Sequence, residues 1–155
     1  MSAWNDPGRW KDLMSGKGCP ICESIEDEGV CRGTVTELES GYLTTQREQT
    51  LRGYCCLVLK RHAVELHELH EDEAQAFVRD LRRVGRTAQE VTGAVKMNVE
   101  IHGNTIPHLH AHFYPRRPGD RFEDGPVDTR RLPVVLNEEE FGRFVSGLRA
   151  ALEEA

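Results

Sequence analysis

Hydrophobic and polar residues alternate most strictly in the segment His108-Leu109-His110-Ala111-His112-Phe113. A period of two is that of a β-strand. On such a strand three imidazoles share one face, about 6.5–7 Å apart, and the three apolar side chains face a core. Alternation from Val95 to Ile101 predicts a second strand just upstream, and His102-Gly103-Asn104 supplies the turn between the two.

Two further β segments are predicted in the first half of the chain. One covers residues 35–45, and the other is the continuous apolar run 54–59, which is typical of a central strand. Residues 46–53 connect them. We expect Cys55 and Cys56 to be packing residues, because adjacent strand residues point to opposite faces and do not reach one site together.

Apolar residues at spacings of three and four predict a long helix over residues 70–92. A short helix is expected within residues 2–16, with Asp6 as its cap and Pro7 in its first turn. A last helix covers residues 137–154, where Asn137 begins a sequence typical of a capping box. Strands that precede and follow a helix predict an α+β fold with a mostly antiparallel sheet and flanking helices.

Length and composition restrict the class of protein. The 155 residues form one ordinary domain, residues 1–155, with an N-terminal extension at 1–18 and an irregular, proline-rich loop at 115–136. A net charge of −6 argues against general binding of nucleic acid, although it allows a local phosphate site. No apolar run has the length of a membrane span and no signal pattern opens the chain, so we expect a cytoplasmic protein.

Three histidines on one strand face indicate chemistry, whereas a single histidine is most often a surface or core residue. Two kinds of site use such a cluster. The imidazoles can bind a metal together. Alternatively, one imidazole acts as a nucleophile or base while its neighbours fix its tautomer.

A second motif is Cys19-Pro20-Ile21-Cys22. Two thiolates at this spacing suit one zinc ion, and a redox dithiol uses the same spacing. A redox pair normally opens a helix after a strand, and no strand is predicted upstream of Cys19. Zinc requires two more ligands, which histidines must supply because the sequence has no second CxxC. Five cysteines, an odd number, do not indicate a secreted disulfide scaffold.

The segment 108–114 resembles the His-φ-His-φ-His-φ-φ signature of the histidine triad (HIT) superfamily of nucleotide hydrolases and transferases. Gly103-Asn104 before it and Pro115-Arg116 after it are also similar to that family. So is Gly53, followed by a hydrophobic strand that ends in a basic pair and His62. The resemblance extends from Cys19 to Arg117, and it implies a HIT-like fold and a homodimer.

The resemblance also implies a reaction. In the family the middle histidine attacks the α-phosphorus of a nucleotide and forms a nucleotidyl-histidine, and this role falls on His110. His112 would then lie beside the leaving group as a proton donor, and Asn104 would contact phosphate or leaving group. Asn98 helps to build the substrate site or is structural. Gln46 is found where many members have a ribose-binding Asn, and it either contacts the sugar or is an exposed turn residue.

Within the family, this sequence further resembles a zinc-containing, bacterial-type branch. That resemblance implies a structural zinc held by Cys19, Cys22, His62 and His108, which leaves His110 free to attack. The partner implied is a nucleoside phosphate, with a purine preference that comes from the family. The individual substrate does not follow from the sequence.

Two other functions remain open. In one, His108, His110 and His112 hold a catalytic zinc with an open water position, as in metal-dependent hydrolases. That site would leave the CxxC motif unexplained. In the other, the chain is a non-catalytic, zinc-stabilised nucleotide-binding module, which would leave His110 without a purpose.

Overall fold

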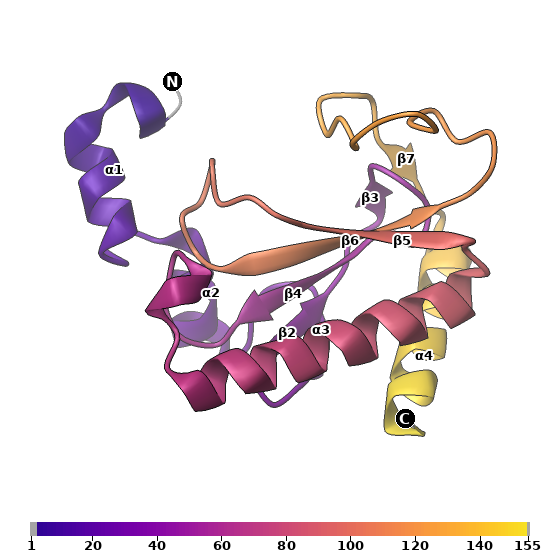
Figure 1. Ribbon diagram of the computed structural model, residues 1–155, viewed down its shortest axis with the longest axis horizontal. Coiled ribbons are helices and arrows are strands. Elements are labelled where there is room, and N and C mark those ends of the chain that lie inside the picture. The colour runs from indigo at the N-terminus through magenta and orange to yellow at the C-terminus, as the bar shows by residue number, and fades with distance from the viewer. Residues whose placement is uncertain (1–2, 155) are drawn as a thin grey trace.

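The computed structural model describes residues 3–154, and within them the chain forms a five-stranded antiparallel sheet flanked by helices (Figure 1). The strands are ordered β1-β2-β4-β6-β5. This arrangement confirms the predicted α+β class. The helices are α1 (Pro7–Met14), α2 (Pro20–Glu28), α3 (Glu71–Thr92) and α4 (Glu138–Glu153), with short 3-10 turns at Ala3–Asn5 and Leu66–Glu68. The strands are β1 (Thr34–Glu37), β2 (Gly41–Thr44), β3 (Glu48–Gln49), β4 (Cys55–Leu59), β5 (Lys96–Ile101), β6 (His110–Arg116) and β7 (Val134–Val135).

The predicted helix caps are present. Asp6 accepts a hydrogen bond from the Arg9 amide at 3.0 Å, and Asn137 and Glu140 form a reciprocal capping box at the start of α4. Ser2, the first residue of the segment that was expected to contain this first helix, is outside the described residues. Within residues 3–154 no helix has both the length and the apolarity to cross a membrane. The expected cytoplasmic location stays a prediction.

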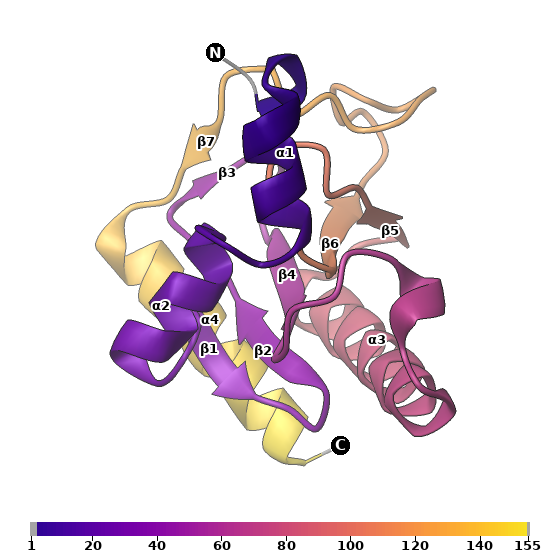
Figure 2. The same ribbon diagram turned by 90° about the vertical axis from the view of Figure 1, so that its left-hand side faces the viewer.

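The two faces of the sheet differ in chemistry because strand side chains alternate. Cys55, Leu57 and Leu59 of β4 and Ala111 and Phe113 of β6 face a core that α3 and α4 cover. Cys56 and Val58 point to the opposite face, where α2 packs (Figure 2). Cys55 and Cys56 are therefore packing residues on opposite faces, as predicted. On β6 the same alternation directs His110 and His112 away from the main core.

Two strand predictions are corrected. Residues 35–45 form a hairpin, β1–β2, because the Leu38 amide donates to the Gly41 carbonyl at 2.8 Å and the chain reverses. Strand β6 begins at His110, since the Leu109 amide donates instead to the Ala63 carbonyl, at 2.6 Å. Strand β5 is present where it was predicted, from Lys96 to Ile101, and it is an edge strand whose Val99 is exposed.

Two connecting segments are more regular than predicted. The stretch 46–53 contains β3, and the loop expected at 115–136 contains the end of β6 and all of β7. Strands β3 and β7 pair with each other in a second, two-stranded sheet. Strands of two residues are too short to produce a periodic pattern, and this is why the sequence did not indicate them.

Candidate functional site

A cavity of about 940 Å³ lies on the face of the sheet opposite α3. Side chains of β4 and β6 form its floor, α2 forms one wall, and the turn 102–106 forms another. His110 and His112 both line it. Its volume is within the usual range for small-molecule sites, so the cavity is the candidate substrate site.

The His110 ring is oriented by the main chain two residues before it. Its Nδ1–H donates to the carbonyl oxygen of His108 at 2.5 Å. Because a neutral imidazole carries one proton, this bond leaves Nε2 as the unprotonated nitrogen with a free lone pair. Burial lowers the pKa of His110 below its ordinary value, although the bond to the carbonyl acts in the opposite direction. The ring is therefore neutral and nucleophilic at neutral pH.

His112 lies next to His110 and has a different partner. The two ring centroids are 4.7 Å apart, and the Tyr54 hydroxyl lies 2.8 Å from Nδ1 of His112. Burial, with smaller contributions from His110 and His102, lowers the pKa of His112 to about 3. The ring is therefore uncharged at neutral pH and carries a single proton.

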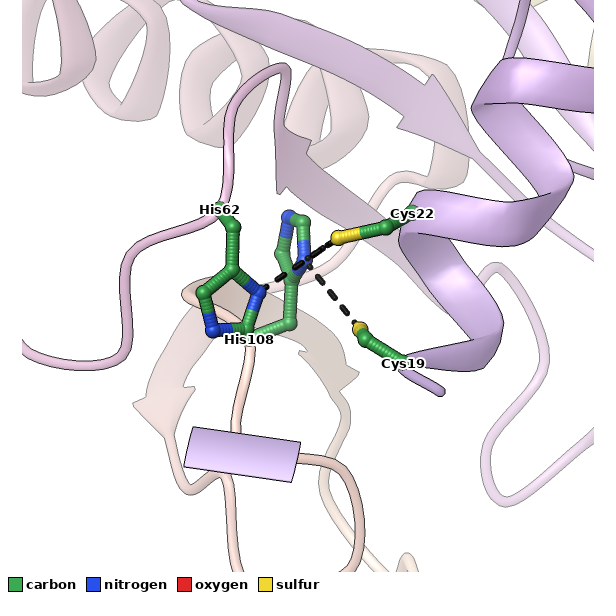
Figure 3. Close-up of side chains that lie close together, drawn as sticks. All are labelled: Cys19, Cys22, His62 and His108. Carbon is green, nitrogen blue, oxygen red and sulfur yellow. Dashed lines mark hydrogen bonds between the residues drawn. The ribbon is translucent and has the colours of Figure 1, made fainter. Parts of the chain in front are cut away.

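The ring of His108 belongs to a separate cluster. Its side chain is completely buried, and it meets Cys19, Cys22 and His62 in a group whose donor atoms all lie within 4.8 Å of one another (Figure 3). Nδ1 of His108 is 3.6 Å from Sγ of Cys19 and 3.5 Å from Sγ of Cys22. Nδ1 of His62 is 3.4 Å from Sγ of Cys22. Residues distant in sequence thus converge at one point.

These distances fit a tetrahedral metal site. Zinc binds sulfur at about 2.3 Å and nitrogen at about 2.0–2.1 Å, so a tetrahedron places sulfur and nitrogen about 3.6 Å apart. The observed sulfur–nitrogen separations are 3.4–3.6 Å. Two cysteines with two histidines are also a donor set typical of structural zinc sites.

Both histidines of this cluster are fixed in the tautomer that metal binding requires. Nε2 of His108 donates to the Leu59 carbonyl at 2.8 Å, and Nε2 of His62 donates to the Met14 carbonyl at 3.1 Å. With the proton on Nε2, the Nδ1 lone pair points at the cysteines. The CxxC motif opens α2, as a redox dithiol would, but both of its sulfurs face imidazole nitrogens.

The model of one protein family matches more than half of the chain. It is the HIT domain, matched over residues 33–119. The chain belongs to the HIT family. The match begins after Cys19 and Cys22, so the matched region does not include the CxxC motif.

Solved structures of other HIT proteins share this fold. One is a histidine triad protein from Bradyrhizobium japonicum, 28% identical with a TM-score of 0.72, which covers 77% of this chain and 89% of that one. Another, from Marinobacter aquaeolei, is 27% identical with a TM-score of 0.71, covering 78% of this chain and 88% of that one. A Zn-bound histidine triad family protein from Mycobacterium smegmatis has a TM-score of 0.65 at 22% identity and covers 88% of this chain and 94% of that one. A comparison with curated proteins finds no match.

The predicted site residues of this HIT protein fall into distinct places. Asn104 and Gln46 line the cavity together with His110 and His112. Asn98 is half-buried in the middle of β5, opposite Tyr114, and it is not among the described residues that line the cavity. Its position is that of a structural strand residue.

The three histidines of the triad do not converge on one point. The ring of His108 faces the cysteines, and Nδ1 of His110 is engaged by the main chain. Within residues 3–154 the one cluster with metal-ligand geometry contains His108 but neither His110 nor His112. The geometry therefore does not favour a catalytic zinc held by the whole triad.

Two cavity residues were missed by the sequence reasoning. Tyr54 opens an apolar run that predicts a buried strand, and nothing in that pattern indicates a partner for a histidine. His102 was assigned only to a turn, yet its ring lies 5.4 Å from that of His112 and Nε2 donates to Glu100 at 2.9 Å. The one feature of the sequence that could have indicated His102 as a site residue is its position close to the triad motif.

Proposed function

We propose that this protein is a nucleotide hydrolase or nucleotidyl transferase that acts at an α-phosphate through a nucleotidyl-His110 intermediate. The observation that carries the proposal is the hydrogen bond from Nδ1 of His110 to the His108 carbonyl. It supports a ring whose Nε2 lone pair is available in the cavity and whose orientation is fixed before substrate binds.

The reaction has two displacements. The Nε2 lone pair of His110 forms a bond to the α-phosphorus, the bond to the leaving group breaks, and its electron pair stays on the leaving atom. The imidazole then carries positive charge, which the bond from Nδ1–H to the His108 carbonyl stabilises. Water, or an acceptor such as phosphate, next attacks phosphorus, His110 leaves with the nitrogen–phosphorus electron pair, and solvent takes the proton that water loses.

Other cavity residues would bind the substrate. His112 donates a hydrogen bond to the leaving atom or to a non-bridging oxygen, and Asn104 contacts the same phosphate from the turn 102–106. Gln46, an exposed residue at the cavity wall, would contact the ribose. Asn98 supports the strand behind the site. The expected substrate is a nucleoside phosphate with a purine base, on the ground of family membership.

We assign a structural role to the metal cluster, with zinc held by Cys19, Cys22, His62 and His108. Support comes from the donor set and its spacing, and a structural neighbour is described as Zn-bound. When bound, zinc would join α2 to the strand that carries His110 and stabilise the fold. The proposed reaction steps use only protein side chains.

A trapping experiment tests the proposal. The protein is mixed with a nucleotide labelled at the α-phosphate, quenched within the first turnover in denaturant, digested and mapped by mass spectrometry. Label on His110 is the expected result. Turnover without any labelled histidine would favour a catalytic-metal hydrolase, and tight binding without turnover would favour a non-catalytic module.

The homodimer expected from the family also remains a proposal. Strand β5 is at the edge of the sheet, and its Val99 and Ile101 are 46% and 38% exposed, while Val95, directly before the strand, is 67% exposed. An exposed apolar edge strand is a surface that another chain can cover. Light scattering should give twice the chain mass for the wild type and a monomer for Val99→Lys; a monomeric wild type would contradict the proposal.

A further inference from the structure

The hydroxyl group of Tyr54 is brought to His112 by the pairing of two neighbouring strands. Cys56 is directly opposite His112 in the β4–β6 ladder, and Tyr54 precedes Cys56 by two residues. Tyr54 is thus a diagonal neighbour of His112, at a distance that an aromatic side chain spans. Its ring packs against that of Tyr114, with centroids 5.3 Å apart, and its hydroxyl ends 2.8 Å from Nδ1 of His112.

The direction of this hydrogen bond follows from the chemistry of the groups. Burial raises the pKa of Tyr54 above its ordinary value, so the hydroxyl keeps its proton. The groups with which it forms hydrogen bonds are Nδ1 of His112 and the thiol of Cys56. A neutral imidazole nitrogen is a much better acceptor than a thiol sulfur, so the proton of Tyr54 points to Nδ1.

We propose that Tyr54 is a positioning residue that holds His112 in the tautomer with its proton on Nε2. A neutral imidazole whose Nδ1 accepts a hydrogen bond must carry its single proton on the other nitrogen. The tautomer rests on the 2.8 Å contact and on the greater acceptor strength of an imidazole nitrogen compared with a thiol. Its catalytic meaning rests on the proposed function, because the Nε2–H then faces the leaving group.

The tautomer matters because charge develops on the leaving atom. As the bond from His110 to phosphorus forms, the breaking bond leaves an electron pair on that atom, and an N–H group beside it stabilises the charge. The proton stays on His112 throughout, and solvent protonates the product after release. In the other tautomer His112 would direct a lone pair at the same negative charge, which is repulsive.

A magnetic resonance experiment reads the tautomer without any turnover. Wild type and Tyr54→Phe are labelled with ¹⁵N-histidine, and the His112 signals are assigned by their loss in His112→Gln. We expect an unprotonated Nδ1 and a protonated Nε2 in the wild type, and a mixture of tautomers in Tyr54→Phe. A proton on Nδ1 in the wild type would overturn the proposal, even if Tyr54→Phe failed to fold. The same single tautomer in wild type and Tyr54→Phe would also overturn the proposal.

A kinetic experiment separates positioning from packing. Tyr54→Phe keeps the aromatic ring, and it should lower kcat about tenfold for nucleotides with poor leaving groups while changing KM little. With good leaving groups the loss should be much smaller. Tyr114→Phe is the matched control, because it removes a hydroxyl from the same wall that does not bond His112, and any effect should be uniform across the series.

Uniform slowing by Tyr54→Phe across the leaving groups would contradict the proposal. Absence of nucleotide turnover in the wild type would instead refute the proposed function. The ¹⁵N result would still decide what Tyr54 does to His112.

Discussion

The main-chain carbonyl of His108 accepts a hydrogen bond from Nδ1 of His110 at 2.5 Å. The ring of the same His108 faces Cys19 and Cys22, and its Nε2 donates to Leu59 at 2.8 Å. One residue therefore connects the Cys2His2 cluster to the proposed nucleophile. Its ring is fixed by the cluster and by β4, and its carbonyl orients His110. Stability of the cluster and orientation of the His110 ring are thus linked through a single residue.

Replacement of the proposed nucleophile should abolish the reaction. His110→Asn removes the Nε2 lone pair that attacks phosphorus, so turnover should fall by about 1,000-fold or more. Nucleotide affinity should change little, because the rest of the cavity is kept. Steady-state kinetics and calorimetric titration with a non-hydrolysable analogue measure the two effects. Near-normal turnover in this variant would contradict the assignment of His110.

Loss of a residue that stabilises charge on the leaving group should lower the reaction rate by an amount that depends on that leaving group. His112→Ala should slow nucleotides with poor leaving groups more than those with good ones, because the lost hydrogen bond acts on the departing atom. Rates are compared across a series of phosphate esters or amidates of graded leaving-group pKa. A constant factor across the series would indicate that His112 only orients other groups.

Replacement of Asn104 should change turnover without a large change in stability. Its side chain is exposed on the cavity wall, so Asn104→Ala should change the free energy of unfolding by less than about 0.5 kcal/mol. Turnover should nevertheless fall, since an amide contact to the phosphate is lost. Chemical denaturation and kinetics on the same preparation measure both quantities. Unchanged turnover would remove Asn104 from the site.

Loss of a metal ligand should lower the stability of the fold more than it lowers the activity of the folded protein. Cys22→Ser should lower zinc content and stability together, with at least about 3 kcal/mol lost in the free energy of unfolding at saturating zinc. Activity per folded molecule should fall far less than in His110→Asn. Metal analysis and thermal unfolding measure the first two effects.

The matched control is Cys31→Ser, since Cys31 is a buried free cysteine outside the cluster and its variant should keep zinc. Zinc retained in Cys22→Ser but lost in His110→Ala would favour the catalytic-metal function instead.

The loop after β6 is held by a pH-sensitive ion pair. Arg116 donates to both carboxylate oxygens of Asp120, at 2.8 and 3.1 Å, and each side chain is only 10% exposed. These bonds lower the pKa of Asp120 from 3.8 to about 2. The pair therefore stabilises the fold fully above about pH 4, and this contribution is lost as the pH falls through about 2.

Asp120→Asn should cost about 1–3 kcal/mol in the free energy of unfolding at pH 6. The difference from wild type should shrink as the pH is lowered toward 2. Urea denaturation over this pH range measures it. Asp124→Asn, an exposed change in the same loop, should have no such effect. A pH-independent difference for Asp120→Asn would show that the charge of Asp120 is unimportant.

Local patterns predicted the elements that bury a continuous apolar stripe. The period of two placed the core-facing residues of β6, and the spacing of three and four placed α3 and α4, because burial of a long face enforces that period. Strands β3 and β7 lack such a face. They pair with each other across a long separation in sequence, so local patterns did not reveal them.

The sequence by itself determined the ligand types, the alternation that separates the histidines from the core, and the family resemblance. It did so because these features depend on residue identity and on neighbours within a few positions. Only the tertiary structure brought His62 and His108 within metal-binding distance of the CxxC motif and Tyr54 against His112. Those contacts join residues 40 to 89 positions apart, and their geometry depends on strand register and helix packing, which the whole chain sets together.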